Sequence, residues 1–242
     1  MSSRKPVNPY APGASSARGG GAPSGDDEPY TGGFWRDIPT ALLVPFHPGR
    51  LVLTVIAGLA IWLVGHMPII GLMLHYALTM LFFAVWVQSA ADGRQDIMPP
   101  MSDLNAGELL GIAVRALIGC LPVFLPLLLV NYGINPWLIV AWIVLTLPAM
   151  LITLAMTDGL LDAGNPLYWL RIVLAEPVAF VVAAVIFIAL SYLGNLAAIW
   201  VGAHVPVALV GMASCVAGIV PSVSGAHVLG AYVNCFRDEL TD

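Results

Sequence analysis

Long apolar runs with almost no charged residue recur along this chain, and they restrict its fold more than any other feature. The run PIIGLMLHYALTMLFFAVWVQSA has no charged residue, and LLGIAVRALIGCLPVFLPLLLV, soon after it, has one. A helix needs about 20 apolar residues to cross the ~30 Å hydrocarbon core of a bilayer. Only 10% of all residues are charged, against about 25% in a soluble domain. The sequence therefore predicts an all-α polytopic membrane protein, because long runs favour helices over the alternating pattern of a membrane β-barrel.

We predict a membrane helix bundle of six transmembrane helices arranged as three hairpins. The connections between the spans alternate in character. Three of them, HMP, NYGINP and AHVP, have no charged residue, whereas ADGRQDIMPPMSDLNAGE and TDGLLDAGNPLYWLRIVLAEP are rich in charge. The predicted spans lie at about 50–65, 68–89, 109–130, 136–156, 177–202 and 207–234.

The distribution of positive charge predicts the orientation of the spans. All nine Lys and Arg residues fall on the side opposite the three neutral connections, or at span ends that face that side. Positive residues near span ends are held on the cytoplasmic side during insertion. With six spans, both termini are expected in the cytoplasm.

The chain is expected to divide into an N-terminal tail and one membrane domain. Residues 1–33 are rich in Gly, Pro and Ser and cannot bury enough apolar surface to order themselves, so we predict a disordered cytoplasmic tail. Residues 34–239 form the six-helix domain. Each predicted hairpin follows a mixed polar and apolar segment: GFWRDIPTALLVPF, SDLNAGELLGIAVRAL or NPLYWLRIVLAEP.

These mixed segments are interpreted as short amphipathic helices in the headgroup layer. Aromatic side chains at the membrane interface would anchor them, with Phe34, Trp35, Tyr168 and Trp169 as candidates. The alternative is that the segments are only the first turns of the spans that follow.

Ionisable side chains inside the bilayer are costly and often functional, so each one is a candidate. Arg115, Arg171 and Glu176 lie near cytoplasmic span ends, where an ion pair or a contact with lipid headgroups is expected. His75 and His227 lie deeper, on the second and sixth spans, where hydrogen bonds between helices are favoured over a proton relay. We find no sequence pattern for a catalytic group, a cofactor or a metal site, and we expect no enzyme activity.

Small residues recur at every fourth position of the last predicted span. Spacing by four places side chains close to one face of a helix, and small residues let helix backbones approach closely in membranes. We interpret this stripe as a helix-packing face, within the chain or between subunits, with a substrate pathway as the alternative. Its members are Ser214, Gly218, Ser222, Ala226 and Gly230.

Three segments resemble a family of small bacterial inner-membrane proteins that have a domain of unknown function. They are the connector ADGRQDIMPPMSD, the phrase LPAMLITLAMTDGLLDAGNPLYWLRIVLAEP and the ending SGAHVLGAYVNCFRDEL. The resemblance extends over residues 34–239, although Met101 stands where the family has an aromatic residue. It implies a bundle of about six helices in a bacterial inner membrane, and it implies no activity or ligand.

Two classes of function remain open. The first is a non-enzymatic protein that packs with, assembles or stabilises other membrane components. Its partners would be membrane lipids, other membrane proteins or a second copy of the chain, and not nucleic acid, since the net charge is −5. The second is a small transporter or channel for a neutral or weakly polar solute, because Pro122, Pro126, Pro148 and Pro221 interrupt three spans and broken helices can bind substrate.

Overall fold

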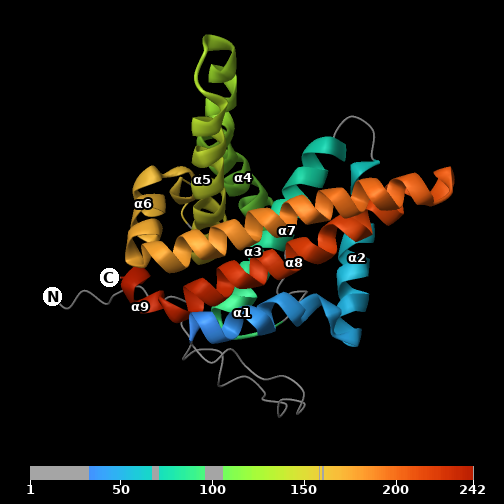
Figure 1. The fold of residues 1–242 in the computed structure, drawn as a ribbon, viewed down its shortest axis with the longest axis horizontal. Helices are drawn as coiled ribbons and strands as arrows, with labels where there is room; N and C mark the ends of the chain where they lie inside the picture. Colours follow the sequence, from blue (N-terminus) through green and yellow to red (C-terminus); the bar gives the residue numbers. More distant parts are fainter. Residues whose placement is uncertain (1–32, 67–70, 96–105, 158, 160, 242) are drawn as a thin grey trace.

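The computed structural model describes residues 33–66, 71–95, 106–157, 159 and 161–241 (Figure 1). These residues form helices joined by turns, and no strand occurs among them. The predicted all-α class is therefore confirmed. The predicted tail falls on residues that lie, apart from Gly33, outside the described part of the chain.

Four segments are long and apolar enough to cross a membrane, which is consistent with a membrane protein. They are α2 (Pro48–Gly65), α5 (Pro136–Met156), α7 (Pro177–His204) and the segment Val207–Cys235, which holds a short 3-10 turn and then α8 (Val210–Cys235). They match the first, fourth, fifth and sixth predicted spans.

Helices also occupy the second and third predicted spans. They are α3 (Gly71–Ala91) and α4 (Ala106–Phe124), and α4 continues as a 3-10 helix over Leu125–Tyr132. Within the described residues, their apolar parts are shorter, at Leu78–Ala91 and Val114–Leu128. Among the described residues, four candidate spans are therefore found, and the predicted six spans in three hairpins are not confirmed.

Helix α8 is the centre of the fold. It packs along α7 in the most extensive helix contact of the structure, and it also contacts α1 (Phe34–Leu43), α2 and α3. Figure 1 shows α7 and α8 side by side along the long axis, with α1 below α8. The core at their junction holds Tyr232, whose ring centroid lies 5.8 Å from that of Phe180 and 6.1 Å from that of Phe34.

The pair formed by α4 and α5 does not run alongside α7 and α8. In Figure 1, α5 lies transverse to these two helices, with one end near α7, and it extends away from them. The indole N–H of Trp142 donates a 3.2 Å hydrogen bond to the carbonyl oxygen of Pro122 and so connects α5 to α4. The far end of α5 is exposed, and Trp137 is 77% accessible. The candidate spans therefore do not share one direction.

Two of the three mixed segments form short helices, α1 and α6 (Pro166–Ala175), whereas the second runs directly into α4 from Ala106. The second mixed segment therefore forms the first turns of the following helix and not a separate short helix. Of the four aromatic anchors, Trp35 and Tyr168 are exposed, but Phe34 and Trp169 are buried in the core. Consecutive helical residues point about 100° apart, so each aromatic pair places one ring inside and one outside.

The prolines interrupt fewer spans than expected. Helices α5 and α8 continue through Pro148 and Pro221 without a break in the helix. Among the three spans that contain these prolines, the third changes its geometry beside one of them, where α4 gives way to the 3-10 helix at Leu125, just before Pro126. The prediction of three interrupted spans was wrong for the fourth and sixth.

Candidate functional site

Helix α6 carries the charged candidate Arg171, and its two ends are set by local sequence. The Asn165 side-chain oxygen accepts a 3.0 Å hydrogen bond from the Leu167 N–H, which caps the first turn. Pro166 follows at the first helical position, where its missing N–H costs nothing. Pro177 disfavours helical geometry at the preceding residue, so Glu176 ends the helix.

The inner face of α6 is fixed to the core by two hydrogen bonds. Trp169 and Ile172 are both buried. The Trp169 indole N–H donates to the Ala163 carbonyl oxygen at 3.0 Å, and the Tyr232 hydroxyl of α8 donates to the Ile172 carbonyl oxygen at 2.7 Å. The rotation of α6 about its own axis is therefore determined, and so is the face that it turns outward.

The outer face of α6 is apolar with one cation on it. Leu167, Leu170 and Leu174 are 73%, 54% and 62% exposed, and Arg171 lies among them. Positions i, i+3, i+4 and i+7 share one face of a helix. A leucine face that is turned outward suits contact with lipid, and a long Arg side chain can lie along such a face with its charge in the headgroup layer.

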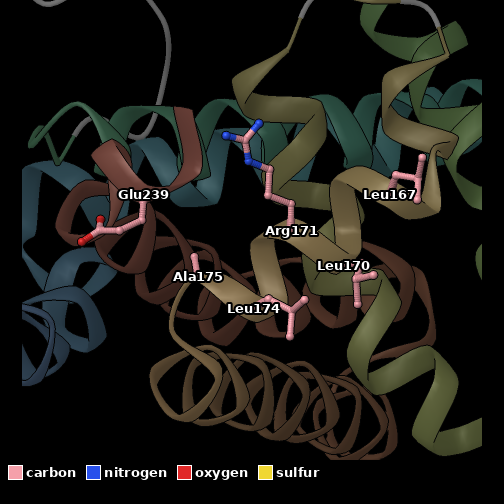
Figure 2. Close-up of a pocket in the computed structure, with 6 residues that line it drawn as sticks. All are labelled: Leu167, Leu170, Arg171, Leu174, Ala175 and Glu239. Atoms are coloured by element: carbon pink, nitrogen blue, oxygen red, sulfur yellow. The ribbon is translucent and has the colours of Figure 1, made fainter. Parts of the chain in front are cut away.

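A shallow surface depression of about 430 Å³ lies on this face (Figure 2). Its lining combines apolar side chains of α6 with one cation and one anion, and the anion comes from α9 (Arg237–Thr241). Arg171 also lines a second, smaller depression of about 120 Å³ beside Thr157 and Tyr168. The first depression is lined by Leu167, Leu170, Arg171, Leu174, Ala175 and Glu239.

The structure separates the three charged candidates. Arg171 and Glu176 form no ion pair with each other within the described part of the chain. Arg115 lies on α4, half-buried, and its guanidinium donates a hydrogen bond to the carbonyl oxygen of Thr157 just after α5. Arg115 thus ties α4 to the end of α5, while Arg171 stays on the outer surface.

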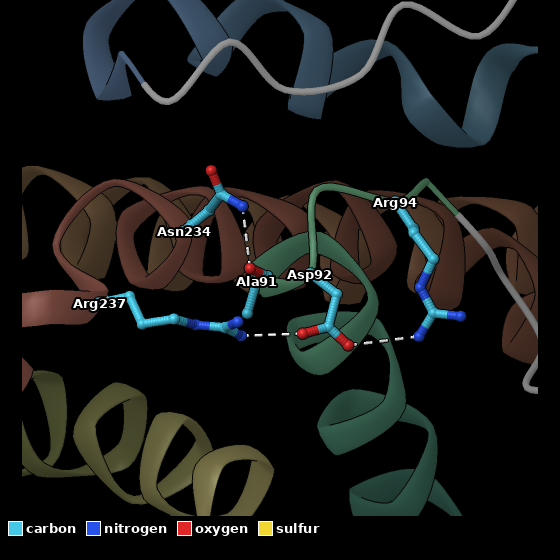
Figure 3. A network of polar contacts seen from close by, with 5 residues as sticks. All are labelled: Ala91, Asp92, Arg94, Asn234 and Arg237. Atoms are coloured by element: carbon cyan, nitrogen blue, oxygen red, sulfur yellow. Dashed lines mark hydrogen bonds and ion pairs between the residues drawn. The ribbon is translucent and has the colours of Figure 1, made fainter. Parts of the chain in front are cut away.

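An ion-pair network that the sequence did not reveal joins the C-terminal ends of α3 and α8 (Figure 3). The Asp92 carboxylate lies 2.8 Å from the Arg237 guanidinium and 3.3 Å from that of Arg94. Beside it, the Asn234 amide donates to the Ala91 carbonyl oxygen at 2.9 Å. These contacts connect the first part of the connector ADGRQDIMPP to the last helical span.

Gly93 explains how this connector turns. Its φ is +75°, in the left-handed region that glycine adopts without strain. The Gly93 N–H bonds to the Ala90 carbonyl at 3.0 Å, and the Arg94 N–H bonds to the Ser89 carbonyl at 2.9 Å. This is the Schellman arrangement that closes a helix C-terminus. It places Asp92 where its carboxylate pairs with both Arg94 and Arg237.

The small-residue stripe of α8 meets two different neighbours. Ser214 donates to the Ala198 carbonyl oxygen of α7 at 2.9 Å. Gly218 also meets α7, where it lies against Gly194. At the other end, a methyl group added at Gly230 would lie 2.5 Å from the Val87 carbonyl oxygen of α3.

Helix geometry explains this division. A four-residue step turns by 400°, so the stripe drifts about 40° per step and about 160° over its length. The two members between its ends differ in their surroundings. Ser222 donates within its own helix to the Gly218 carbonyl at 3.1 Å, and Ala226 is fully buried. The stripe is therefore two close contacts on nearly opposite sides of α8, not one continuous face.

The two histidine candidates lie in packed positions. The Nδ1 atom of His75 lies 3.2 Å from the Ile61 carbonyl oxygen and connects α3 to α2. His227 is completely buried on α8. The sequence did not predict a further buried ionisable group, Asp37, which is only 2% exposed on the inner face of α1. Its spacing of three and four from the buried Phe34 and Ala41 was the available signal.

One repeated phrase was overlooked in the sequence. AIWLVGHMP at 60–68 and AIWVGAHVP at 198–206 share Ala, Ile, Trp, His and Pro at equal spacing. In the structure, the Nδ1 atoms of His66 and His204 lie 2.8 and 2.7 Å from the carbonyl oxygens of Trp62 and Trp200. The C-terminal ends of α2 and α7 thus carry the same Trp–His arrangement.

A polar side chain was also overlooked on the outer surface of α7. Asn195 is exposed between large apolar side chains, among them Tyr192 and Ile199. Its amide donates one hydrogen bond, at 3.0 Å, to the Ser191 carbonyl oxygen of its own helix. An amide has two N–H donors and an oxygen acceptor. In the described part of the chain, its oxygen accepts no hydrogen bond.

Comparison with known proteins finds no protein-family model, curated protein or solved structure that matches this chain. The described residues contain no group of three or more His, Cys, Asp or Glu that could hold a metal ion. The candidate sites therefore rest on their own geometry.

Proposed function

We propose that this chain is a non-enzymatic integral membrane protein that packs with other membrane proteins through the outer face of α7. In this proposal it has six spans, with both termini in the cytoplasm of a bacterial inner membrane. The matching Trp–His arrangements support placing the C-terminal ends of α2 and α7 on the same side of the membrane. Membership of the bacterial family that the sequence resembles is part of the same hypothesis.

The observation that carries the proposal is the position of Asn195. Helix α7 has 28 residues, and Asn195 lies four to five residues beyond its midpoint, about 7 Å along the axis. The hydrocarbon core extends about 15 Å to each side of its centre. If α7 spans the bilayer centrally, the amide therefore lies inside the hydrocarbon, where each unsatisfied polar group costs several kcal/mol.

A neighbouring transmembrane helix would satisfy this amide. Asparagine side chains hydrogen-bond across helix pairs in membranes and contribute about 0.6–2 kcal/mol. The aromatic and aliphatic side chains around Asn195 supply the apolar contact area that such a helix would cover. Because the amide lies on the outer surface of α7 among exposed apolar side chains, its position favours packing with another helix over passage of a solute.

The proposal is tested by site-specific photo-crosslinking in cells. A photoreactive residue at Ile199, one turn from Asn195, should give discrete cross-linked protein bands. The same residue at Leu193, about 160° around the helix from Asn195 on the shorter side, should react mainly with lipid. Replacing Asn195 with Leu should abolish the bands from Ile199 and leave the amount of inserted protein unchanged. Equal cross-linking with and without the amide would contradict the proposal.

A further inference from the structure

We propose that the depression between α6 and α9 binds the headgroup of phosphatidylethanolamine. Arg171 takes the phosphate, Glu239 takes the primary ammonium, and the exposed leucines of α6 lie along the start of an acyl chain. This inference goes beyond the proposed packing of α7 and is independent of it, because it concerns another face of the molecule.

The two charges that line the depression are both available. In the described part of the chain, neither the Arg171 guanidinium nor the Glu239 carboxylate has a hydrogen-bond or ion-pair partner. Figure 2 shows Glu239 on α9 to one side of Ala175, one turn along α6 from Arg171, with its carboxylate pointing away from Ala175 and the Arg171 guanidinium pointing in another direction. A cation and an anion therefore line one depression without neutralising each other.

The surroundings place this depression at the level of lipid headgroups. Helix α9 packs against α6 and follows directly on the C-terminal end of α8. The Asp92–Arg237 ion pair lies at the same end of α8. Charged side chains gather where a membrane protein meets water, whereas Leu167, Leu170 and Leu174 need apolar cover. A lipid supplies both environments in one molecule.

The charge pattern selects among lipid headgroups. An anionic headgroup such as phosphatidylglycerol would satisfy Arg171 but would be repelled by Glu239. Phosphatidylcholine has a phosphate and a cation, but its quaternary ammonium has no N–H to donate to a carboxylate. The ammonium of phosphatidylethanolamine donates up to three hydrogen bonds, as a lysine ammonium does. The hydrogen bonds of this lipid to Arg171 and Glu239 would both be charge-assisted, and such bonds are stronger than those between neutral groups.

The shape of the depression agrees with a headgroup. Its volume is about 430 Å³. It is shallow and open, so it would hold a headgroup at the surface and leave the acyl chains in the bilayer.

The test is lipid binding to the purified full-length protein, measured by native mass spectrometry in a mild detergent. Phosphatidylethanolamine, phosphatidylcholine and phosphatidylglycerol of identical acyl chains are added separately. Wild-type protein should bind phosphatidylethanolamine most tightly. Arg171→Gln should weaken this binding roughly tenfold, since a hydrogen-bonded charge is lost, and Arg171→Lys should retain part of it.

Glu239→Gln tests the contact with the ammonium group separately from the contact of Arg171 with the phosphate. It should reduce the preference for phosphatidylethanolamine over phosphatidylcholine and increase binding of phosphatidylglycerol. Arg36→Gln, an exposed cation on α1, is the matched control and should change none of these values. Tighter binding of phosphatidylglycerol than of phosphatidylethanolamine by the wild type would overturn the proposal. So would an unchanged lipid preference in both Arg171→Gln and Glu239→Gln.

Discussion

The contact between α7 and α8 offers a sharp test, because the same two glycines face each other with unequal clearance. A methyl group added at Gly194 would lie 2.5 Å from the Gly218 carbonyl oxygen. A methyl group added at Gly218 would lie 3.6 Å from the Gly194 carbonyl oxygen and 3.8 Å from the Ala198 methyl group, both ordinary contact distances. Gly194→Ala should therefore destabilise the protein, and Gly218→Ala should not.

The magnitude follows from the geometry. The methyl group added at Gly194 would lie about 0.9 Å closer to the Gly218 carbonyl oxygen than the 3.4 Å at which ordinary contact begins. Because this oxygen belongs to the backbone, it cannot rotate away as a side chain could. The helices must separate locally, and overpacking of this kind typically costs ~1–3 kcal/mol. Both substitutions also gain up to about 1 kcal/mol in helix propensity. The free energies of unfolding of the two variants should thus differ by about 1–3 kcal/mol.

The assay is unfolding in mixed detergent micelles, followed by circular dichroism as the fraction of denaturing detergent rises. Gly218→Ala should unfold at the wild-type midpoint or slightly above it, and Gly194→Ala should unfold earlier. Because each variant adds one methyl group to the same contact, differences in hydrophobicity cancel. Coincident midpoints for the two variants would refute the close approach of the α7 and α8 backbones at this point.

Two further predictions concern the charged ends and the topology. Asp92→Asn should lower the free energy of unfolding by up to ~1 kcal/mol, since the ion pairs are partly exposed, and high salt should reduce the loss. Glu239→Gln is its control, and an equal loss in both would contradict the network. Single cysteines in a cysteine-free background should react with an impermeant reagent outside intact cells at positions 66, 133 and 204. Cysteines at positions 94 and 162 should not, and labelling of either from outside would reverse the proposed orientation.

The sequence predicted the helical class and most helix bounds because both depend on local chemistry. Apolar runs ended by Pro and Gly placed α2, α5 and α7 within a few residues of where they lie. The step from Asn165 to Pro166 is a capping signal that is read directly from neighbouring residues. Such features need no knowledge of which helix packs against which.

The contacts between helices were harder to predict, because periodicity identifies a face but not the neighbour that covers it. Gly218 and Gly230 share a spacing and yet meet α7 and α3 respectively. Nor did the positive charge of Arg237 indicate that it would pair with Asp92, 145 positions earlier. The transverse direction of α5 relative to α7 and α8 likewise follows from tertiary packing, which no local pattern records.

The central place of α8 has a consequence for the order of events during synthesis. It leaves the ribosome after the other long helices described above, and its end comes about 140 residues after the end of α3, which it contacts. At ~5–20 residues per second, α3 waits roughly 7–30 s for this partner, and α1 and α2 wait longer. Until then, the surface of α3 that Gly230 contacts stays uncovered. The earlier helices must therefore stay in the membrane before the core around α8 can form. A chain that is truncated before residue 210 lacks the helix that α1, α2, α3 and α7 all contact.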